Sequence, residues 1–571
     1  MKTRDQILEL ASLREFDLVI IGAGIVGAGI AQDAACRGLS VVVIDKDDFA
    51  SGTSSRTTKL IHGGLRYLEQ LQFKLTSELC KERALLEVLA PHLVRDFSFV
   101  LPLTKGHPLL QLKASVGLTL YDLLAFMAGH SEPHKRISRK EVLESAPALA
   151  DSQVIGGLRF HDAITDDSRL VIEVLKSACT NGAHAINYME ATGFGIDTSA
   201  RINKVECRDR YSGKKVVFRC KACVNATGVW SDQVTRMIDK RWRDRVLPSK
   251  GVHIVVPQSA FETNTALFLP APDKRYVFVV PWQRALMIGP TDTLYKDDVN
   301  NPMANEDEVD YLLSVVNSYN GQRRLNRSDV IATWAGLRPL AGASDPALKQ
   351  EKLASRNGKS GQSSSATGNV SREHEIFDGP HGMIGVVGGK LTNYRIMANQ
   401  VMERVLERFP QLALVDAKTS RTKRIMLGGW LDKQDYLTLT AAISTKARKL
   451  SIEPATIDHL IASYGKDAQF VLEVVEKDPS LNERICPDFP PIMAEIPYCV
   501  SKEMAVSLED LLARRIRLAQ LHHRQCLEAA PKVTHLMQQL LGWDDTRVAA
   551  ELSALQFSVG RLPWQQDAVI Y

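Results

Sequence analysis

A glycine-rich turn near the N-terminus constrains this chain more than any other feature. Residues 22–27 read Gly-Ala-Gly-Ile-Val-Gly; they follow an apolar, β-prone run at Phe16–Ile21 and open a helical pattern at Ile25–Arg37. A second apolar run at Ser40–Asp45 completes a strand–helix–strand unit. This order of elements predicts a Rossmann-like unit that binds a dinucleotide.

Each position in this unit has its own physical task. Gly22 permits the tight turn, Gly24 lets the backbone approach a pyrophosphate, and Gly27 allows the helix to pack closely on the strand. The helix N-terminus offers unpaired N–H groups to the phosphates. Asp45, at the end of the second strand, is placed to accept hydrogen bonds from ribose hydroxyls. A glycine-rich turn without a ligand is the alternative, and the complete unit argues against it.

Two later segments favour FAD over NAD. Val224–Gly228 (VNATG) is a short strand ending in Ala-Thr-Gly, a pattern typical of two-dinucleotide-type flavoproteins. Gly385–Thr392 (GVVGGKLT) places a second glycine turn between a strand and a helix, where such flavoproteins cover the flavin ring. An NAD-only dehydrogenase has no need for this second turn. The sequence therefore predicts FAD as the cofactor.

The middle of the chain predicts a mixed sheet that walls a substrate pocket. Short β-prone runs occur there at Ala185–Tyr188, Lys215–Arg219, His253–Val256, Tyr276–Val280 and Ala285–Ile288. Beyond residue 411 the pattern becomes helical, with segments at Tyr436–Leu450, Ala468–Glu476 and Glu503–Glu528. We therefore expect an α/β chain with an N-terminal extension (1–15), an FAD-binding domain with an interleaved substrate domain (16–410, with a flexible loop at 349–370), and a C-terminal α-helical domain (411–571).

The composition limits which kinds of partner the chain can be expected to bind. A net charge of +5 is small for 571 residues, so we expect no nucleic acid, although it suits an anionic substrate or membrane surface. Nine cysteines are spread thinly, which favours a reducing cytosolic compartment. Cys220 and Cys223 form one Cys-x-x-Cys without a second pair. We interpret them as structural rather than as a metal or redox site, and expect no metal.

Ala114–Gly129 is the chain's nearest approach to a membrane-spanning segment. It is too short to span a bilayer, and Asp122 interrupts it. Its apolar residues have helical spacing: Val116, Leu120, Leu123, Leu124 and Met127. A core helix is the favoured interpretation, and a helix in contact with a membrane surface is the alternative.

Several longer motifs resemble the FAD-dependent glycerol-3-phosphate dehydrogenases. They are DFASGTSSRTTKLIHGGLRY (Asp48–Tyr67), WAGLRPL (Trp334–Leu340), Ser371-Arg372, GGKLTNYR (Gly388–Arg395) and LEDLLARRIRL (Leu508–Leu518). They run in the family's order from about residue 15 to about residue 530. The resemblance implies a D-amino-acid-oxidase-type fold and oxidation of sn-glycerol 3-phosphate to dihydroxyacetone phosphate. It also implies electron transfer from FAD to a membrane quinone, peripheral lipid contact on the cytoplasmic membrane face, and a possible homodimer.

The resemblance also assigns roles to single residues. Arg66, Tyr67, Arg338 and Arg372 fall in substrate-binding motifs, and arginine suits a phosphate dianion because it binds oxygen pairs. His253 matches a family histidine and is our candidate base for the C2 hydroxyl, a structural histidine being the alternative. Arg338 is the alternative group to stabilise a developing alkoxide, and the Lys390 charge would favour reduced flavin. The expected cofactor contacts are Gly22, Gly24, Gly27, Asp45, Thr53, Ser54, Ser55, Lys59, Leu60, His62, Ala191, Gly228, Gly388, Gly389, Lys390, Leu391 and Thr392.

Three other functions are less favoured. A glycerol-3-phosphate oxidase of the same family would use oxygen, but such oxidases carry a longer insertion after the AGLRPL motif than the interval from Leu340 to Ser371 allows. An amine or amino-acid oxidoreductase on this fold would not require three cations. A non-catalytic FAD-binding protein would not need the arginines together with His253 and Lys390.

Overall fold

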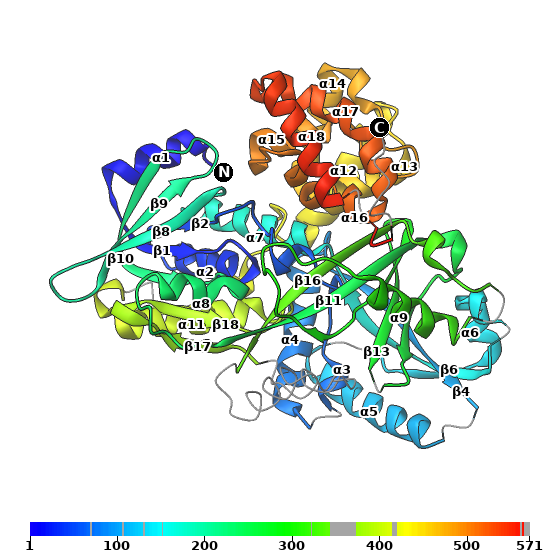
Figure 1. Cartoon of the computed structure of the whole chain (residues 1–571). Coiled ribbons are helices and arrows are strands. Elements are labelled where there is room, and N and C mark those ends of the chain that lie inside the picture. The colour runs from blue at the N-terminus through cyan, green and yellow to red at the C-terminus, as the bar shows by residue number, and fades with distance from the viewer. Residues whose placement is uncertain are drawn as a thin grey trace.

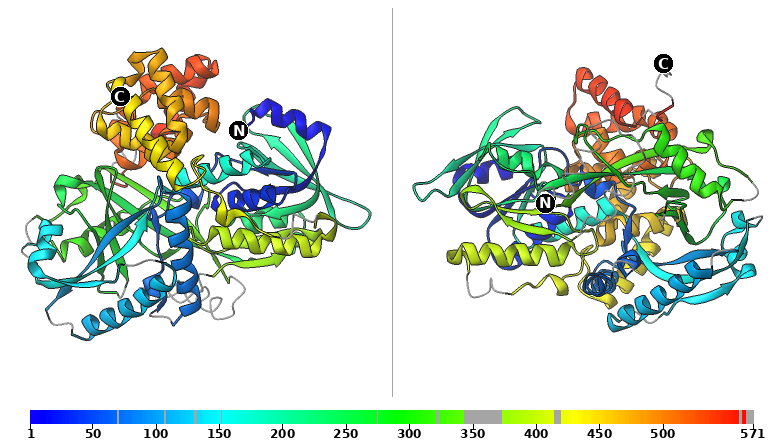
Figure 2. Two further views of the ribbon diagram at one scale, coloured as in Figure 1. Left: turned by 180° about the vertical axis from the view of Figure 1, so that it is seen from behind. Right: turned by 60° about the horizontal axis from the view of Figure 1, so that its bottom comes forward.

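The computed structural model describes residues 1–68, 71–105, 108–129, 132–150, 152–273, 275–320, 323–342, 373–413, 419–559 and 562–564, without the side chains of residues 66 and 108–110. The loop predicted at 349–370 and the predicted substrate residue Arg372 lie outside this range. Within it, two sheets lie side by side, and the C-terminal helices lie above the sheet on the right of Figure 1 (Figures 1 and 2).

The first sheet is the predicted Rossmann-like unit. Its parallel core pairs β1 (Glu15–Ile21) with β2 (Val41–Ile44) and β10 (Lys215–Asn225), continuing to β7 (His184–Ile186) and β18 (Ile384–Val387). Antiparallel strands complete it: β8 (Met189–Ile196), β9 (Ile202–Asp209) and β17 (Glu375–Asp378). All four residues of β2 are buried, as expected for a parallel strand covered on both faces.

Three helices pack together beside this sheet. α2 (Ile25–Cys36) lies against both α7 (Asp167–Thr180) and α11 (Tyr394–Arg408). The N-terminal helix α1 (Arg4–Leu13) contacts β7 and β10. The predicted runs Ala185–Tyr188 and Lys215–Arg219 also belong to this sheet, so their assignment to the substrate domain was wrong. Strand propensity alone does not say with which sheet a run will pair.

The second sheet is mixed, as predicted, and has ten strands in the part of the chain that the structure describes. Its order is β15 (Thr293–Leu294), β11 (Val246–Pro257), β14 (Ala285–Gly289), β13 (Tyr276–Trp282), β12 (Ala266–Pro270), β4 (Arg95–Thr104), β6 (Val154–Ile164) and β3 (Leu60–Ile61), with β16 (Ala332–Ala341) on β11 and β5 (Lys135–Ser138) on β6. Helix α9 (Glu306–Asn317) packs on β11 and β13.

The C-terminal helices form the predicted helical domain. They are α12 (Lys433–Lys449), α13 (Pro454–Tyr464), α14 (Ala468–Lys477), α15 (Glu495–Glu503), α16 (Leu518–Leu521), α17 (His523–Leu541) and α18 (Asp545–Val559). Their apolar core is continuous with one face of the second sheet, since Trp334 and Leu511 belong to the same buried cluster. The domain is therefore packed on the sheet.

The segment Glu503–Glu528, predicted to be helical, is divided into several short helical pieces. α15 ends at Glu503, and Met504 and Arg517 have left-handed backbones with φ of 54° and 72°. Between them lies a π-helical turn at Asp510–Arg515. The breaks let the buried Arg514 and Arg515 pair with Asp48, and Arg517 with Asp167. These tertiary contacts override local helix propensity.

Helix α5 (Pro108–Met127) is not the core helix that we favoured. Among its described side chains (residues 111–127) only Leu118, Tyr121 and Ala125 are buried, whereas the exposed fractions of Val116, Leu123 and Met127 are 61%, 56% and 66%. The helix packs on α3 (Leu65–Leu68) and α4 (Phe73–Leu89), on the opposite side of the molecule from the helical domain (Figure 1). Among the helices that the structure describes, none is long and apolar enough to cross a membrane.

Candidate functional site

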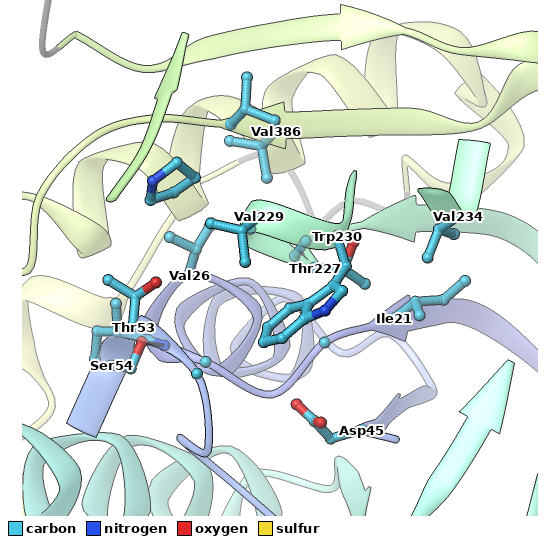
Figure 3. A pocket seen from close by; sticks show the side chains of 18 of the residues that line it. Ile21, Val26, Asp45, Thr53, Ser54, Thr227, Val229, Trp230, Val234 and Val386 are labelled. Atoms are coloured by element: carbon cyan, nitrogen blue, oxygen red, sulfur yellow. Dashed lines mark hydrogen bonds between the residues drawn. The ribbon is translucent and has the colours of Figure 1, made fainter. Parts of the chain in front are cut away.

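A cavity lies at the carboxyl ends of the parallel strands β1, β2, β10 and β18, the position where open α/β sheets bind ligands (Figure 3). The chain segments that follow these four strands all contribute to its wall. The expected cofactor contacts that line it are Gly22, Gly24, Asp45, Thr53, Ser54, Ala191, Gly228, Gly388, Gly389, Lys390 and Leu391.

The glycine turn has the geometry that a phosphate-binding turn requires. Gly22 has a φ of +99°, and a Cβ there would lie 2.6 Å from the carbonyl oxygen of Ala226. A Cβ on Gly27 would lie 1.8 Å from the carbonyl oxygen of Gly22, so Gly27 allows the helix to approach the turn. The nearest neighbour of a Cβ on Gly24 would be the Ser54 hydroxyl oxygen, at 3.0 Å. These residues fit a dinucleotide pyrophosphate at the start of α2.

Asp45 stands at the end of β2 and reaches back to the turn. Its carboxylate accepts the amide protons of Ala23 at 2.7 Å and Asp47 at 3.1 Å. Burial raises the pKa of this carboxyl to about 7, against the opposing effect of the Ala23 hydrogen bond. Figure 3 shows the carboxylate on the side of the cavity where the Trp230 indole lies. The pair offers a hydrogen-bond acceptor and a flat apolar surface to a nucleotide.

A second cavity opens between the two sheets and shares part of its wall with the first. The shared residues are Thr53, Thr57, Pro339 and the turn 388–391. The expected site residues that line it are Leu60, His62, Tyr67, His253, Arg338, Lys390 and Thr392. The structure thus brings the expected catalytic residues together beside the expected cofactor turn.

His253 lies on β11 directly opposite Trp334 of β16. The two rings stack with centroids 5.0 Å apart, and the His253 Nε2 lies 3.0 Å from the Thr58 hydroxyl. Burial holds the pKa of this imidazole well below its usual value, and the charges of Arg338 and Lys59 act in the same direction. His253 is therefore a neutral imidazole at neutral pH and can accept a proton.

The cations of the cavity are held by neighbouring groups. Arg338 Nη2 donates to the Thr291 carbonyl at 3.2 Å, and its Nη1 to Asp292 and Ser249 at 3.4 Å. The Lys390 ammonium lies 3.3 Å from the centroid of the Tyr67 ring. Both cations therefore have fixed positions on the cavity wall.

Other expected residues lie elsewhere. Ser55 and Lys59 are buried and line neither cavity; they face the helical domain. Arg66 lies next to Tyr67 in α3, where the structure describes its backbone only.

Several wall residues were missed by the sequence analysis. They are Arg56, Thr57, Thr58, Trp230, Arg275, Thr291 and Asp292. Trp230 follows the Ala-Thr-Gly segment and Thr57 and Thr58 lie inside the long motif, so their positions gave a usable signal. Arg275 and Asp292 lie in short strand–turn segments that gave none.

The chain is similar to known proteins along most of its length. A family described as FAD dependent oxidoreductase matches residues 17–372, and one described as the C-terminal domain of alpha-glycerophosphate oxidase matches residues 420–548. The aerobic glycerol-3-phosphate dehydrogenase of Staphylococcus epidermidis is 31% identical over 560 residues, covering 97% of this chain and 96% of that one. Glycerol-3-phosphate dehydrogenase 2 of Mycobacterium tuberculosis is 34% identical over 545 residues, covering 94% and 87%.

Two solved structures show the same fold. The glycerol-3-phosphate dehydrogenase from Bacillus halodurans complexed with FAD has a TM-score of 0.78 and 29% identity, and the match covers 99% of each chain. The L-alpha-glycerophosphate oxidase from Mycoplasma pneumoniae has a TM-score of 0.51 and 17% identity, and the match covers 69% of this chain and 95% of that one. The second likeness concerns the fold alone.

The glycine turn predicts a selective effect on cofactor binding. Gly24→Ala adds a methyl group where only the Ser54 hydroxyl is near, so the fold should tolerate it while a pyrophosphate is pushed away. We expect the Kd for FAD to rise about tenfold or more, which is about 1.4 kcal/mol, with little change in Tm. Quenching of flavin fluorescence on titration into apoprotein measures the Kd. Gly117→Ala, in α5 with open space around it, is the matched control, and an unchanged Kd for Gly24→Ala would contradict the assignment.

Proposed function

Because the chain belongs to the FAD-dependent glycerol-3-phosphate dehydrogenase family and has FAD as its cofactor, we propose that it oxidises sn-glycerol 3-phosphate to dihydroxyacetone phosphate. The observation that carries the proposal is the second cavity, which is lined by Arg338, Lys390 and the neutral His253 and shares the turn 388–391 with the cofactor cavity. A phosphate dianion requires such cations, and a secondary alcohol requires a proton acceptor.

Within this proposal each side chain has one task. Arg338 binds the substrate, together with Tyr67, Arg66 and Arg372. His253 accepts the proton of the C2 hydroxyl at Nε2 by way of the Thr58 hydroxyl, which lies 3.0 Å from this nitrogen: Thr58 gives its own proton to Nε2 and takes the substrate's in its place. Bound FAD supplies the acceptor for the hydride. Lys390, within the shared turn 388–391, adds a positive charge that would stabilise the negative charge of reduced FAD bound beside it.

The same proposal assigns the cofactor contacts. Gly22 and Gly24 leave room for the pyrophosphate, and Asp45 accepts hydrogen bonds from the ribose. The remaining contacts are the other expected residues on the first cavity's wall: Thr53, Ser54, Ala191, Gly228 and the turn 388–391.

We propose a membrane quinone as the electron acceptor and lipid contact through α5 at the cytoplasmic face. Five large apolar side chains of α5 are exposed on a stripe with helical spacing: Leu112, Val116, Leu123, Phe126 and Met127. Lys113 is exposed on the same helix, and Lys135 and Arg136 are exposed just after it. An apolar stripe flanked by cations suits an anionic lipid surface. The opposite face of α5 packs on α3, which carries Tyr67, so lipid contact would lie close to the substrate cavity.

Anaerobic reduction tests the proposed substrate. We expect sn-glycerol 3-phosphate to bleach the flavin absorption of the holoprotein without oxygen. Arg338→Met should lower kcat/KM about 100-fold, since it removes a charge-assisted contact worth about 1.5–3 kcal/mol. Arg327→Met, which removes a partly exposed arginine paired with Glu306 and Asp310, is the matched control and should leave the rate unchanged. If the unaltered protein does not bleach, the proposed substrate is wrong.

The depressed pKa of His253 predicts the pH dependence. Only the neutral imidazole accepts a proton, and its pKa lies well below the ordinary 6.5. kcat/KM should therefore stay level through neutral pH and fall only at a clearly more acidic pH. His253→Gln should lower kcat about 100-fold or more, because general-base catalysis contributes that much, and should remove the acid limb. An acid limb centred at pH 6.5 or above, or one that persists in the variant, would show that another group is the base.

Electron acceptor and lipid contact are tested together with vesicles of anionic lipid that contain a quinone. Leu123→Ser with Phe126→Ser should weaken vesicle binding about 100-fold or more, since each buried side chain of this size contributes about 1.5–3 kcal/mol and each 1.4 kcal/mol is tenfold. Quinone reduction in vesicles should fall in parallel, while anaerobic bleaching is unchanged. Leu13→Ser with Leu431→Ser removes two exposed leucines outside α5 and is the matched control. Unchanged vesicle binding would rule out α5, and rapid stoichiometric peroxide formation would favour the oxidase.

A further inference from the structure

The segment 53–62 has two faces with different surroundings. Thr53, Thr57 and Thr58 line the cavities, as described above. Ser55 and Lys59, which line neither cavity, are only 2% and 1% exposed, and the Ser55 carbonyl and the Lys59 ammonium contact the C-terminal helical domain. One short segment therefore connects the site to a domain that contributes no described residue to either cavity.

Two residues of the helical domain hold the rear face of this segment. Arg517 Nη2 donates to the Ser55 carbonyl at 2.8 Å, and Gln520 Nε2 donates to the same oxygen at 2.9 Å. The Lys59 ammonium donates to Gln520 Oε1 at 3.0 Å and to Asp167 at 3.1 Å. Asp167 in turn accepts the amide and hydroxyl protons of Thr57, at 2.9 and 2.8 Å.

The backbone at both ends of this contact is strained. Lys59 has a φ of +58° and Arg517 a φ of +72°, although neither residue is glycine. Non-glycine residues keep this conformation only where their surroundings fix it, and they concentrate at functional sites. Figure 1 shows α16, which follows Arg517, lying over β16, and these two elements are in contact.

From Lys59 the contacts continue to His253. The Lys59 ammonium lies 4.8 Å from the ring centroid of Trp282 and 4.9 Å from that of Trp334. Trp334 is the ring on which His253 stacks, and Thr58, the residue before Lys59, bonds the His253 Nε2. Both groups that contact His253 therefore lie next to Lys59. Burial and the Arg517 charge lower the pKa of Lys59 to about 8, so its polar contacts are needed to keep it charged.

We propose that Arg517 and Gln520 are positioning residues of the active site, which act through Lys59 to fix Thr58, Trp334 and hence His253. The helical domain then has a role in the reaction, although it supplies no group to the described cavity walls. The proposal rests on the proposed function, because it concerns the orientation of the residue assigned there as the base.

A double-mutant cycle on the holoprotein tests this path. Gln520→Met and Lys59→Met each remove one partner of the Lys59–Gln520 hydrogen bond and keep a side chain of similar length. Each should lower kcat about tenfold, which is about 1.4 kcal/mol of barrier, with KM nearly unchanged because Arg338 and Lys390 are untouched. The double variant should be no slower than the slower single variant. Gln538→Met, the same substitution at a partly exposed position of α17 where the side chain donates to Asp545, is the matched control and should keep full activity.

Amide hydrogen exchange provides a readout that does not depend on turnover. Gln520→Met should speed exchange in segment 53–62, and Gln538→Met should not. Gln520→Asn, which stays polar but is one methylene too short to reach Lys59, serves if the methionine variant does not fold. If the unaltered protein does not react with glycerol 3-phosphate, the proposed function fails, and hydrogen exchange alone decides the coupling. Three results would each overturn the proposal. Exchange in segment 53–62 could stay unchanged, the variants could raise KM while kcat stays the same, or the losses in kcat could be additive in the double variant.

Discussion

The carboxylate of Asp48, fully buried just after β2, joins the first sheet to the C-terminal helical domain. It accepts hydrogen bonds from Arg514 at 2.6 Å, from Arg515 at 2.7 Å and from Asn187 at 3.0 Å. Burial alone would raise the pKa of this carboxyl, but Arg515 and Arg514 outweigh it and hold the pKa at about 2. Removing one partner of such a buried pair costs about 3–5 kcal/mol, because it leaves an uncompensated charge. The long motif that begins at Asp48 is therefore fixed at its start by the helical domain.

The same constraint recurs along α7, which lies between the first sheet and the helical domain. Arg169 donates to both carboxylate oxygens of Glu503, at 2.6 and 2.7 Å, and both side chains are buried. Two residues earlier on the same helix, Asp167 forms ion pairs with Lys59 and Arg517. Buried ion pairs add little net stability compared with apolar packing, but they penalise every arrangement that separates their charges. Their effect here is to specify how the domains fit together.

These contacts also explain which features the sequence could predict. The glycine turn, the two strands that flank its helix and the gathering of His253, Arg338 and Lys390 follow from local patterns and from recognisable motifs. The break after Glu503 was not predictable in this way, because its cause is the set of partners that the buried arginines find far away in the chain. The exposure of α5 was missed for a related reason: its apolar residues are spread around the helix, and periodicity alone does not say which face the protein covers. Ser55 and Lys59 lie in the expected motif, but only the folded backbone shows that they face away from the cavities.

The hollow of the substrate cavity depends on the register between β11 and β16. In this antiparallel pair Ser249 lies opposite Arg338, Gly251 opposite Gly336, and His253 opposite Trp334. Residues two apart in a strand share a face, so the two glycines sit between the functional side chains. A Cβ on Gly251 would lie 2.5 Å from the Arg338 guanidinium, and one on Gly336 would lie 2.5 Å from the carbonyl oxygen of Arg56. The missing side chains are thus what lets Arg338 and the segment around Arg56 approach the sheet. A slip of one residue would turn His253 and Arg338 to the opposite face, so this register is as necessary to the site as the side chains themselves.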